Sequence, residues 1–318
     1  MATIDFGVTY YNDKAEYDDL KRYAQIVDSV GLDSLWITEN ITSDSPSLEV
    51  FTALSFLAAN TKTATIGPSV MLLPLRNPVL VAQTMSSLDI LSGGRAVLGV
   101  GVGGSALRGS SERDFIAYGG RVKERGGRAD EALEVIHRLW TEDSVTFKGK
   151  YFDIQDYNLI PKPTHKPHPP IVVGGHAEGV LRRAGRWGDG LMPVRRTVEE
   201  AKGLFERVEE YGRQYGRKPE QFTRYFMFHT CLGDTTEKAA ETASRVLTDR
   251  YRAKNVITPN DPYLLGPVDH CRDVIQQFIE GAGVQHFIFH FCCDPKDVYS
   301  QVKKIGEEII PSLASSAP

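Results

Sequence analysis

The chain has 318 residues, which is long enough to bury a large hydrophobic core without disulfide bonds or metal ions. Hydrophobic residues make up 41% of it and charged residues 25%, an ordinary globular composition that excludes disorder and fibrous repeats. The 37 lysines and arginines against 41 aspartates and glutamates leave a net charge of −4. No general basic field is therefore present to attract nucleic acid or an anionic membrane.

The cysteines and the apolar runs favour a cytoplasmic protein. The 4 cysteines include no CxxC pair and all lie in the last third of the chain, which argues against structural zinc and against a secreted disulfide framework. No apolar stretch approaches the roughly 18 residues that span a bilayer, and the first residues lack the pattern of a signal peptide. We therefore expect no metal site, no membrane and no nucleic-acid partner.

Strand and helix patterns alternate along the chain. Short apolar runs predict strands at 4–10, 33–38, 64–70, 96–102, 171–173, 191–193, 223–232 and 286–291. Apolar residues at helical spacing, with proline or glycine at several ends, predict helices at 16–30, 46–60, 78–91, 122–140, around 181–184, and at 198–215, 236–251, 268–280 and 295–310. A hairpin that turns at Lys148-Gly149 is expected within 145–154.

Eight strands that alternate with helices predict an α/β fold of the (β/α)8 class, a TIM barrel, with insertions after the fourth and seventh strands. A doubly wound open sheet is the alternative fold. No segment rich in glycine, serine or charge divides the chain, so we expect a single domain over 1–318.

The barrel prediction selects candidate site residues, because barrel active sites form at the carboxyl ends of the strands. Glu39 and Asn40 follow the second predicted strand, while His229 and His290 end the seventh and eighth. For each histidine, a place in the pocket and a structural place in the core are equally compatible with the sequence. The phenylalanines that alternate with His290 are better explained by core packing than by contacts with a substrate.

Two glycine-rich turns are candidates for contact with a cofactor. The run GVGVGG at 99–104 indicates backbone close to a planar ring or a phosphate. A dinucleotide-binding turn is the alternative, but no helix starts promptly and no acidic residue follows at the required distance. The turn GGHA at 174–177 precedes a helix, whose first N–H groups can bind a phosphate, although an ordinary tight turn reads the same.

Longer stretches resemble the luciferase-like flavin and deazaflavin oxidoreductases. They are LRNP at 75–78, LDILSGGR at 88–95, LGVGVG at 98–103, RGGRADEAL at 125–133, LW at 139–140, PKP at 161–163, PPIVVGG at 169–175 and RAGRWGDG at 183–190. These matches run in family order from about residue 4 to residue 292, nearly the whole chain. No single piece is diagnostic, but the joint pattern is highly specific.

The resemblance implies a TIM barrel that forms a homodimer and binds a reduced deazaflavin or flavin across the carboxyl ends of its strands. Coenzyme F420 is the first choice and FMN the second. It also implies a cis peptide bond between Ser69 and Val70. The residues that would bind the cofactor are Ser69, Val70, Met71, Gly103, Gly104, Gly174, Gly175, His176 and Ala177.

The implied activity is hydride transfer to or from a small organic substrate, or its monooxygenation. Many relatives have an acidic residue and then histidine where this chain has Glu39-Asn40, and asparagine cannot exchange a proton near neutral pH. We therefore expect Glu39 to hydrogen-bond near the ring or the substrate, Asn40 to orient the substrate, and His229 or His290 to handle the proton.

Three alternatives to this activity remain open. The first is an FMNH2-dependent monooxygenase, which would need a separate reductase to supply reduced flavin. The second is a non-catalytic flavin-binding barrel, suggested by Asn40 in place of histidine. The third is a cofactor-free hydrolase or lyase, for which the sequence offers no metal or carboxylate constellation.

Overall fold

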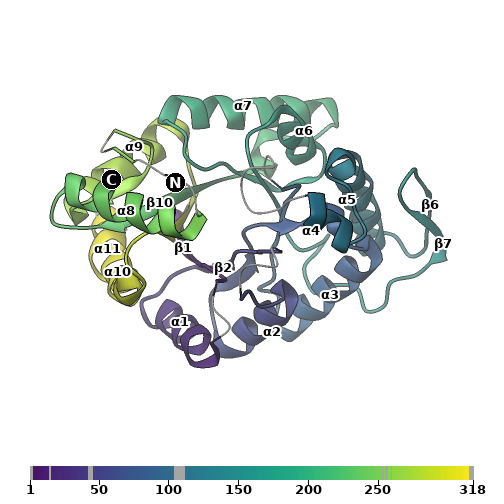
Figure 1. Cartoon of the computed structure of the whole chain (residues 1–318). Coiled ribbons are helices and arrows are strands. Elements are labelled where there is room, and N and C mark those ends of the chain that lie inside the picture. Colours follow the sequence, from purple (N-terminus) through teal and green to yellow (C-terminus); the bar gives the residue numbers. More distant parts are fainter. Residues whose placement is uncertain are drawn as a thin grey trace.

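The computed structural model describes residues 3–13, 16–41, 46–103, 112–251, 254, 257–258 and 260–314. In this part of the chain, parallel strands form a barrel surrounded by helices (Figure 1). The strands of the barrel wall are β1 (Asp5–Tyr10), β2 (Ser34–Ile37), β3 (Thr65–Pro68), β4 (Met71–Leu72), β5 (Leu98–Gly101), β8 (Ile171–Gly174), β9 (Gly190–Met192), β10 (Thr223–Leu232) and β12 (His286–Phe291).

Hydrogen bonds between β3 and the residues that directly precede β5 close the barrel. The strands pair in the order β3-β2-β1-β12-β10-β9-β8-β5-β4. The amide of Ile66 donates to the carbonyl of Arg95 at 2.8 Å, and the amide of Val97 donates to the carbonyl of Ile66 at 2.9 Å. Because β3 and β4 both lie beside β5, they occupy one position in the wall. The eight predicted strands are thus confirmed as a TIM barrel, and the open sheet is excluded.

The surrounding helices are α1 (Tyr17–Ser29), α2 (Val50–Asn60), α3 (Pro78–Leu91), α5 (Arg125–Thr141), α6 (Glu178–Trp187), α7 (Val198–Gln214), α8 (Thr236–Tyr251), α9 (Val268–Ala282) and α10 (Val298–Lys304). Local sequence sets several of their starts. Asn77 accepts hydrogen bonds from the first amides of α3, and Pro78 occupies its first position. Thr197 and Glu200 form a capping box at α7.

The predicted insertions are present, and they include the hairpin predicted within 145–154. After β5 come the short helix α4 (Glu112–Ala117) and the hairpin of β6 (Val145–Lys148) and β7 (Asp153–Tyr157), which projects from the barrel at the right of Figure 1. After β10 comes β11 (Leu264–Gly266), which pairs with β10. The last predicted helix is divided into α10, a π-helical turn over Ile305–Ile309 and α11 (Ile310–Ala314).

Alternation along the strands builds two apolar layers. Phe287, Phe289 and Phe291 point outward and pack with the helices, as predicted. A second cluster fills the inside of the barrel; it consists of Trp36, Val97, Val172, Met192, Tyr225, Met227 and Ile288. A side chain at Gly99 would lie 1.9 Å from the carbonyl oxygen of Pro68, so only glycine lets β5 approach the end of β3 this closely.

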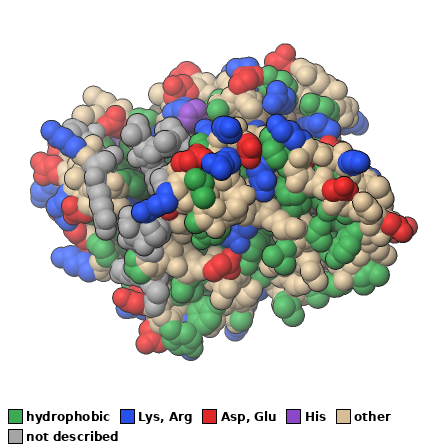
Figure 2. All heavy atoms as spheres, turned by 45° about the vertical axis from the view of Figure 1, so that its right-hand side comes forward, with side chains coloured by type: hydrophobic (Ala, Val, Ile, Leu, Met, Phe, Trp, Pro, Cys, Tyr) green, Lys and Arg blue, Asp and Glu red, His purple; other side chains and the backbone are tan. Residues whose placement is uncertain are grey.

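The described surface carries both signs of charge. Figure 2 shows basic and acidic side chains intermingled on the face that it presents, with hydrophobic side chains between them. None of the helices in the described ranges is long and apolar enough to cross a membrane. All four cysteines are buried and have free thiols.

Candidate active site

Two histidines and a tyrosine meet at the carboxyl ends of three neighbouring strands. His229 points inward from β10 and His290 from β12, and their ring centres lie 4.9 Å apart. The ring of Tyr11, which directly follows β1, lies 5.5 Å from that of His290, edge to face. Tyr263 approaches His229 from the other side at 5.3 Å. The structure therefore brings the two predicted histidines together inside the barrel.

Arg250, in the last turn of α8, covers this group. Its guanidinium lies 3.9 Å from the centre of the Tyr11 ring. Its Nη1 is 3.3 Å from Nε2 of His290 and donates to the carbonyl of Phe291 at 3.1 Å. Burial, His229 and Arg250 together hold the pKa of His290 well below its usual range. An imidazole kept uncharged in this way is less suited than His229 to the proton handling that was expected of one of the two histidines.

The Ser69–Val70 peptide bond is cis, as the family resemblance implies. Both residues are half-buried, and the Ser69 hydroxyl lies 3.4 Å from that of Thr9 on β1. The Val70 side chain rests on two glycines of the facing strands. A Cβ at Gly101 would lie 2.5 Å from Val70 Cγ2, and one at Gly174 would lie 2.8 Å from Val70 Cγ1. The glycines let Val70 lie flat against β5 and β8.

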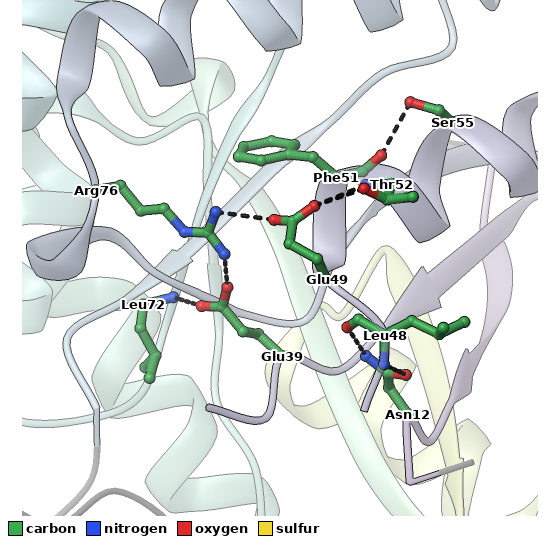
Figure 3. Close-up of polar contacts among 9 residues, drawn as sticks. All are labelled: Asn12, Glu39, Leu48, Glu49, Phe51, Thr52, Ser55, Leu72 and Arg76. Carbon is green, nitrogen blue, oxygen red and sulfur yellow. Dashed lines mark hydrogen bonds and ion pairs between the residues drawn. The ribbon is translucent and has the colours of Figure 1, made fainter. Parts of the chain in front are cut away.

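Glu39 is held by neighbouring protein groups (Figure 3). The amide of Leu72 donates to Glu39 Oε2 at 2.5 Å, and Arg76 forms an ion pair with the other carboxylate oxygen. Arg76 also donates to Glu49 at 2.9 Å, at the start of α2. Burial raises the pKa of Glu39, while Arg76 and the Leu72 amide oppose that rise. The carboxylate thus ties the end of β2 to the segment that follows Val70.

The remaining predicted residues occupy different environments. Asn40 is half-buried directly after Glu39. Met71 is fully buried and packs outward in the layer beneath the helices, so only its backbone remains available at the inner wall. Gly103 has a positive φ of 83°, which glycine adopts without strain. Gly104 lies outside the described residues.

Basic groups gather at the turn after β8. Gly174, Gly175, His176 and Ala177 lead into α6, and the amide of Gly175 donates to the Met192 carbonyl at 3.1 Å. No side chain caps the start of α6 at Ala177. Burial lowers the pKa of the His176 imidazole, and the positive charges of Arg196 and Arg195 lower it further.

Other arginines near this turn have structural partners. Arg183 is buried and binds Asp130 at 2.6 Å and the Gly126 carbonyl at 3.1 Å. Arg186 pairs with Glu134 at 3.3 Å. These two arginines hold α6 against α5. Arg195 and Arg196, at the end of the sixth predicted strand, are better placed to bind an anion.

Sequence reasoning did not find Arg250. It lies in a stretch of α8 with an ordinary helical pattern, and only the packing of α8 beside β10 and β11 brings its guanidinium to Tyr11 and Phe291. Arg195 has a left-handed backbone, with a φ of 52°, of which the sequence carries no signal.

These residues fit a phosphate-bearing tricyclic cofactor. The flat wall of Val70 on two glycines suits a planar ring. The uncapped start of α6 with His176, Arg195 and Arg196 suits an anionic tail. Within the described ranges, no group of three or more histidine, cysteine or acidic side chains is arranged to hold a metal ion.

The fold and the site define a (β/α)8 barrel that carries, at the carboxyl ends of its strands, a buried pair of histidines and a glycine-containing turn at the start of α6. A family model described as luciferase-like monooxygenase matches residues 1–286. The chain belongs to this family of flavin and deazaflavin enzymes, and it is an oxidoreductase.

Two relatives illustrate the similarity. The chain is 29% identical over 331 residues to an F420-dependent glucose-6-phosphate dehydrogenase of Amycolatopsis mediterranei, covering 93% of this chain and 94% of the relative. It is 33% identical over 224 residues to an uncharacterized protein of Mycobacterium tuberculosis, covering 70% of this chain and 71% of that one.

Two solved structures share the fold. An F420-dependent secondary alcohol dehydrogenase, in complex with an F420-acetone adduct, superimposes with a TM-score of 0.82 at 22% identity, over 98% of this chain and 99% of that one. The monooxygenase RslO1 from Streptomyces bottropensis has a TM-score of 0.82 at 20% identity, over 97% and 99%. Both oxidation by F420 and oxygenation thus occur on this scaffold.

Proposed function

We propose that the chain is an F420-dependent dehydrogenase that moves a hydride between a hydroxyl-bearing carbon of a small organic substrate and the cofactor. The end-to-end similarity to an F420-dependent dehydrogenase carries the proposal. A second F420-dependent dehydrogenase, of Mycobacterium tuberculosis, which acts on hydroxymycolic acid, also matches 80% of this chain. The basic groups at the start of α6 support it independently, since F420 has a long anionic tail.

The cofactor would lie on the Val70 wall, with its tail at Gly175, His176 and Ala177. A bound deazaflavin supplies two-electron hydride chemistry and reacts poorly with oxygen. The chain positions the two reactants: the cis bond at Ser69–Val70 forms the backing, and Arg195 and Arg196 neutralise the phosphate charge.

Within the site, His229 is the residue that we assign to the proton of the substrate hydroxyl. It faces the interior from β10, next to Tyr263 and His290. Asn40, at the end of β2, would orient the substrate by hydrogen bonds alone. Glu39 acts through Leu72 and Arg76 in this arrangement, as a positioning residue for the Val70 wall.

Anaerobic titration distinguishes the cofactors. We expect F420 to bind more tightly than FMN, and glucose 6-phosphate or a secondary alcohol to reduce bound F420 without oxygen uptake. Tight binding of FMNH2 followed by oxygen consumption would instead identify the monooxygenase, which would need a separate reductase. Binding of either cofactor with no turnover on any substrate would favour the non-catalytic barrel. The homodimer expected from the family resemblance stays a prediction.

The anionic tail gives a more specific prediction. Arg195→Asn and Arg196→Gln each remove one positive charge, and asparagine tolerates the left-handed backbone at 195. We expect each to weaken F420 binding roughly tenfold and to reduce its dependence on salt. Arg182→Gln, on the exposed side of α6, is the matched control and should change neither. Equal effects from all three variants would mean that only net charge matters.

A further inference from the structure

His290 is a buried, inward-facing imidazole with two different edges. It is 3% exposed, and it follows the alternation of β12 that turns the neighbouring phenylalanines outward. Nε2 faces Nη1 of Arg250 at 3.3 Å. Nδ1 is shielded from solvent and has no hydrogen-bond partner among the described residues. The two nitrogens therefore differ sharply in what they can bind.

Arg250 decides which nitrogen carries the proton. A guanidinium can donate hydrogen bonds but cannot accept them, so Nε2 must be the acceptor in this contact. The same Nη1 uses its other hydrogen on the Phe291 carbonyl at 3.1 Å, and the Tyr11 ring fixes the guanidinium plane from one side at 3.9 Å. A neutral imidazole with an acceptor at Nε2 carries its proton at Nδ1.

The groups around His290 disfavour a charged imidazole. Protonation of Nε2 would place a second donor against the guanidinium of Arg250. The groups around the ring are Arg250 from α8, His229 from β10 and Tyr11 after β1, none of them a carboxylate. Burial and the positive charge of Arg250 lower the pKa of His290 accordingly.

The geometry points to Arg250 as a positioning residue that locks His290 as the neutral Nδ1–H form, which makes His290 a hydrogen-bond donor to an oxygen of the bound substrate. A buried Nδ1–H group without an acceptor is unfavourable, and a substrate oxygen would satisfy it. Because the ring never gains a second proton, its contribution is a fixed donor, and proton exchange is left to His229. This inference rests on the proposed dehydrogenase function for the identity of the acceptor.

Nitrogen-15 NMR of the enzyme without cofactor tests the tautomer directly. The chain has 8 histidines, and the imidazole signal that is lost in the His290→Asn variant identifies His290. We expect a protonated Nδ1 and an unprotonated Nε2 that do not change between about pH 5 and about pH 8. A protonated Nε2, or titration within this range, would overturn the inference whatever the cofactor proves to be.

Variants of Arg250 test whether it fixes the tautomer of His290. Arg250→Met keeps much of the apolar stem and removes the donor, so Nε2 of His290 should become protonated in a substantial fraction of molecules. Arg250→Lys retains a donor and should keep the Nδ1–H form. Arg245→Met, on the same helix but paired with Asp294 at the surface, is the matched control. An unchanged tautomer in Arg250→Met would contradict the role of Arg250.

Kinetics then separate a donor from a base. The amide nitrogen of asparagine occupies about the place of Nδ1, so His290→Asn keeps a donor but offers no base. The assay uses a substrate that reduces bound F420 in the anaerobic titration. We expect His290→Leu to lower kcat/KM roughly ten- to a hundredfold, and His290→Asn to keep most of the native kcat/KM. Equal losses in both variants would reject the donor role. If F420 turnover is absent altogether, the NMR result still stands or falls by itself.

Discussion

Val70 is the residue on which the proposed cofactor wall depends, and glycine on two neighbouring strands determines where it lies. The GVGVGG run predicted backbone close to a planar ring or a phosphate. In the structure, Gly99 approaches the carbonyl of Pro68 and Gly101 approaches the Val70 side chain. The glycines therefore act first within the protein, and their effect on a ring would pass through Val70.

Gly101→Ala should displace Val70. The new Cβ would lie 2.5 Å from Val70 Cγ2, so the valine must rotate or move away from the wall. We expect a loss of about 1–3 kcal/mol in unfolding free energy and weaker binding of F420, measured by urea denaturation and by cofactor titration.

Two further variants check this explanation. Val70→Ala in the Gly101→Ala background removes the clashing methyl group and should recover much of the stability. Gly203→Ala, in α7, adds a Cβ with no atom within 4 Å and should stabilise the helix by about 0.5–1 kcal/mol. Loss of cofactor binding without any loss of stability in Gly101→Ala would mean that the glycine contacts the cofactor directly.

At the scale of elements, the ion pair of Glu39 and Arg76 joins the end of β2 to the segment after β4. The Glu39 side chain is 4% exposed and that of Arg76 is 19% exposed. Arg76 also binds Glu49 at the N-terminus of α2, so three elements meet at one guanidinium. Removal of one partner from such a pair leaves an uncompensated buried charge.

Arg76→Met should therefore destabilise the fold by about 3 kcal/mol at pH 7. Burial already raises the pKa of Glu39, and loss of Arg76 would raise it further. A carboxyl with a raised pKa in the folded state costs stability when it is ionised, above that pKa, and not when it is protonated. The loss should shrink as the pH falls to about 4, where Glu39 is protonated in both states.

Urea denaturation at both pH values measures this change, and Glu39→Gln supplies the control. The glutamine side chain of that variant carries no charge, so Arg76→Met in the Glu39→Gln background should cost much less than in the native chain. Independent, additive losses would show that the two side chains are not coupled.

The strands and helices of the barrel were predictable from the sequence, because their alternating and helical patterns of apolar residues can be read within a short stretch of chain. The strand at 223–232 and the helices at 78–91 and 236–251 agree with the structure to the residue. The three-residue strand β11 and the six-residue helix α4 were missed, since both are too short for a periodic signal. The partners of the site residues were also missed. Arg76 lies 37 residues from Glu39, and only the closed barrel brings them together.

Across the whole molecule, buried histidines lie at both ends of the barrel. His286 begins β12 at the amino end, where its Nε2 lies 2.6 Å from Ser34 Oγ, and Trp36 donates to the same hydroxyl at 2.8 Å. Burial lowers the pKa of His286 to about 3. His290, further along the same strand and on the same face, is likewise kept uncharged. The inside of this barrel therefore tolerates imidazole but not imidazolium.

Acid should consequently destabilise the fold well above the range in which carboxylates titrate. The unfolded chain binds protons on both histidines below about pH 6.5, whereas the folded chain does not, so unfolding takes up protons and stability falls as the pH falls. Each such histidine contributes about 1.4 kcal/mol per pH unit. Asp5, 3.6 Å from His286 Nδ1, has a raised pKa and acts in the opposite direction at lower pH. The pH range in which the histidines alone determine the change therefore ends at about pH 5.

Urea denaturation between about pH 7 and pH 5 should show the fall of the unfolding free energy with pH, and His286→Asn should reduce its slope by close to one proton. If the native chain and the variant lost stability in parallel over this range, His286 would have to be protonated within the fold, and the hydrogen bond to Ser34 would then run from the imidazolium to the hydroxyl.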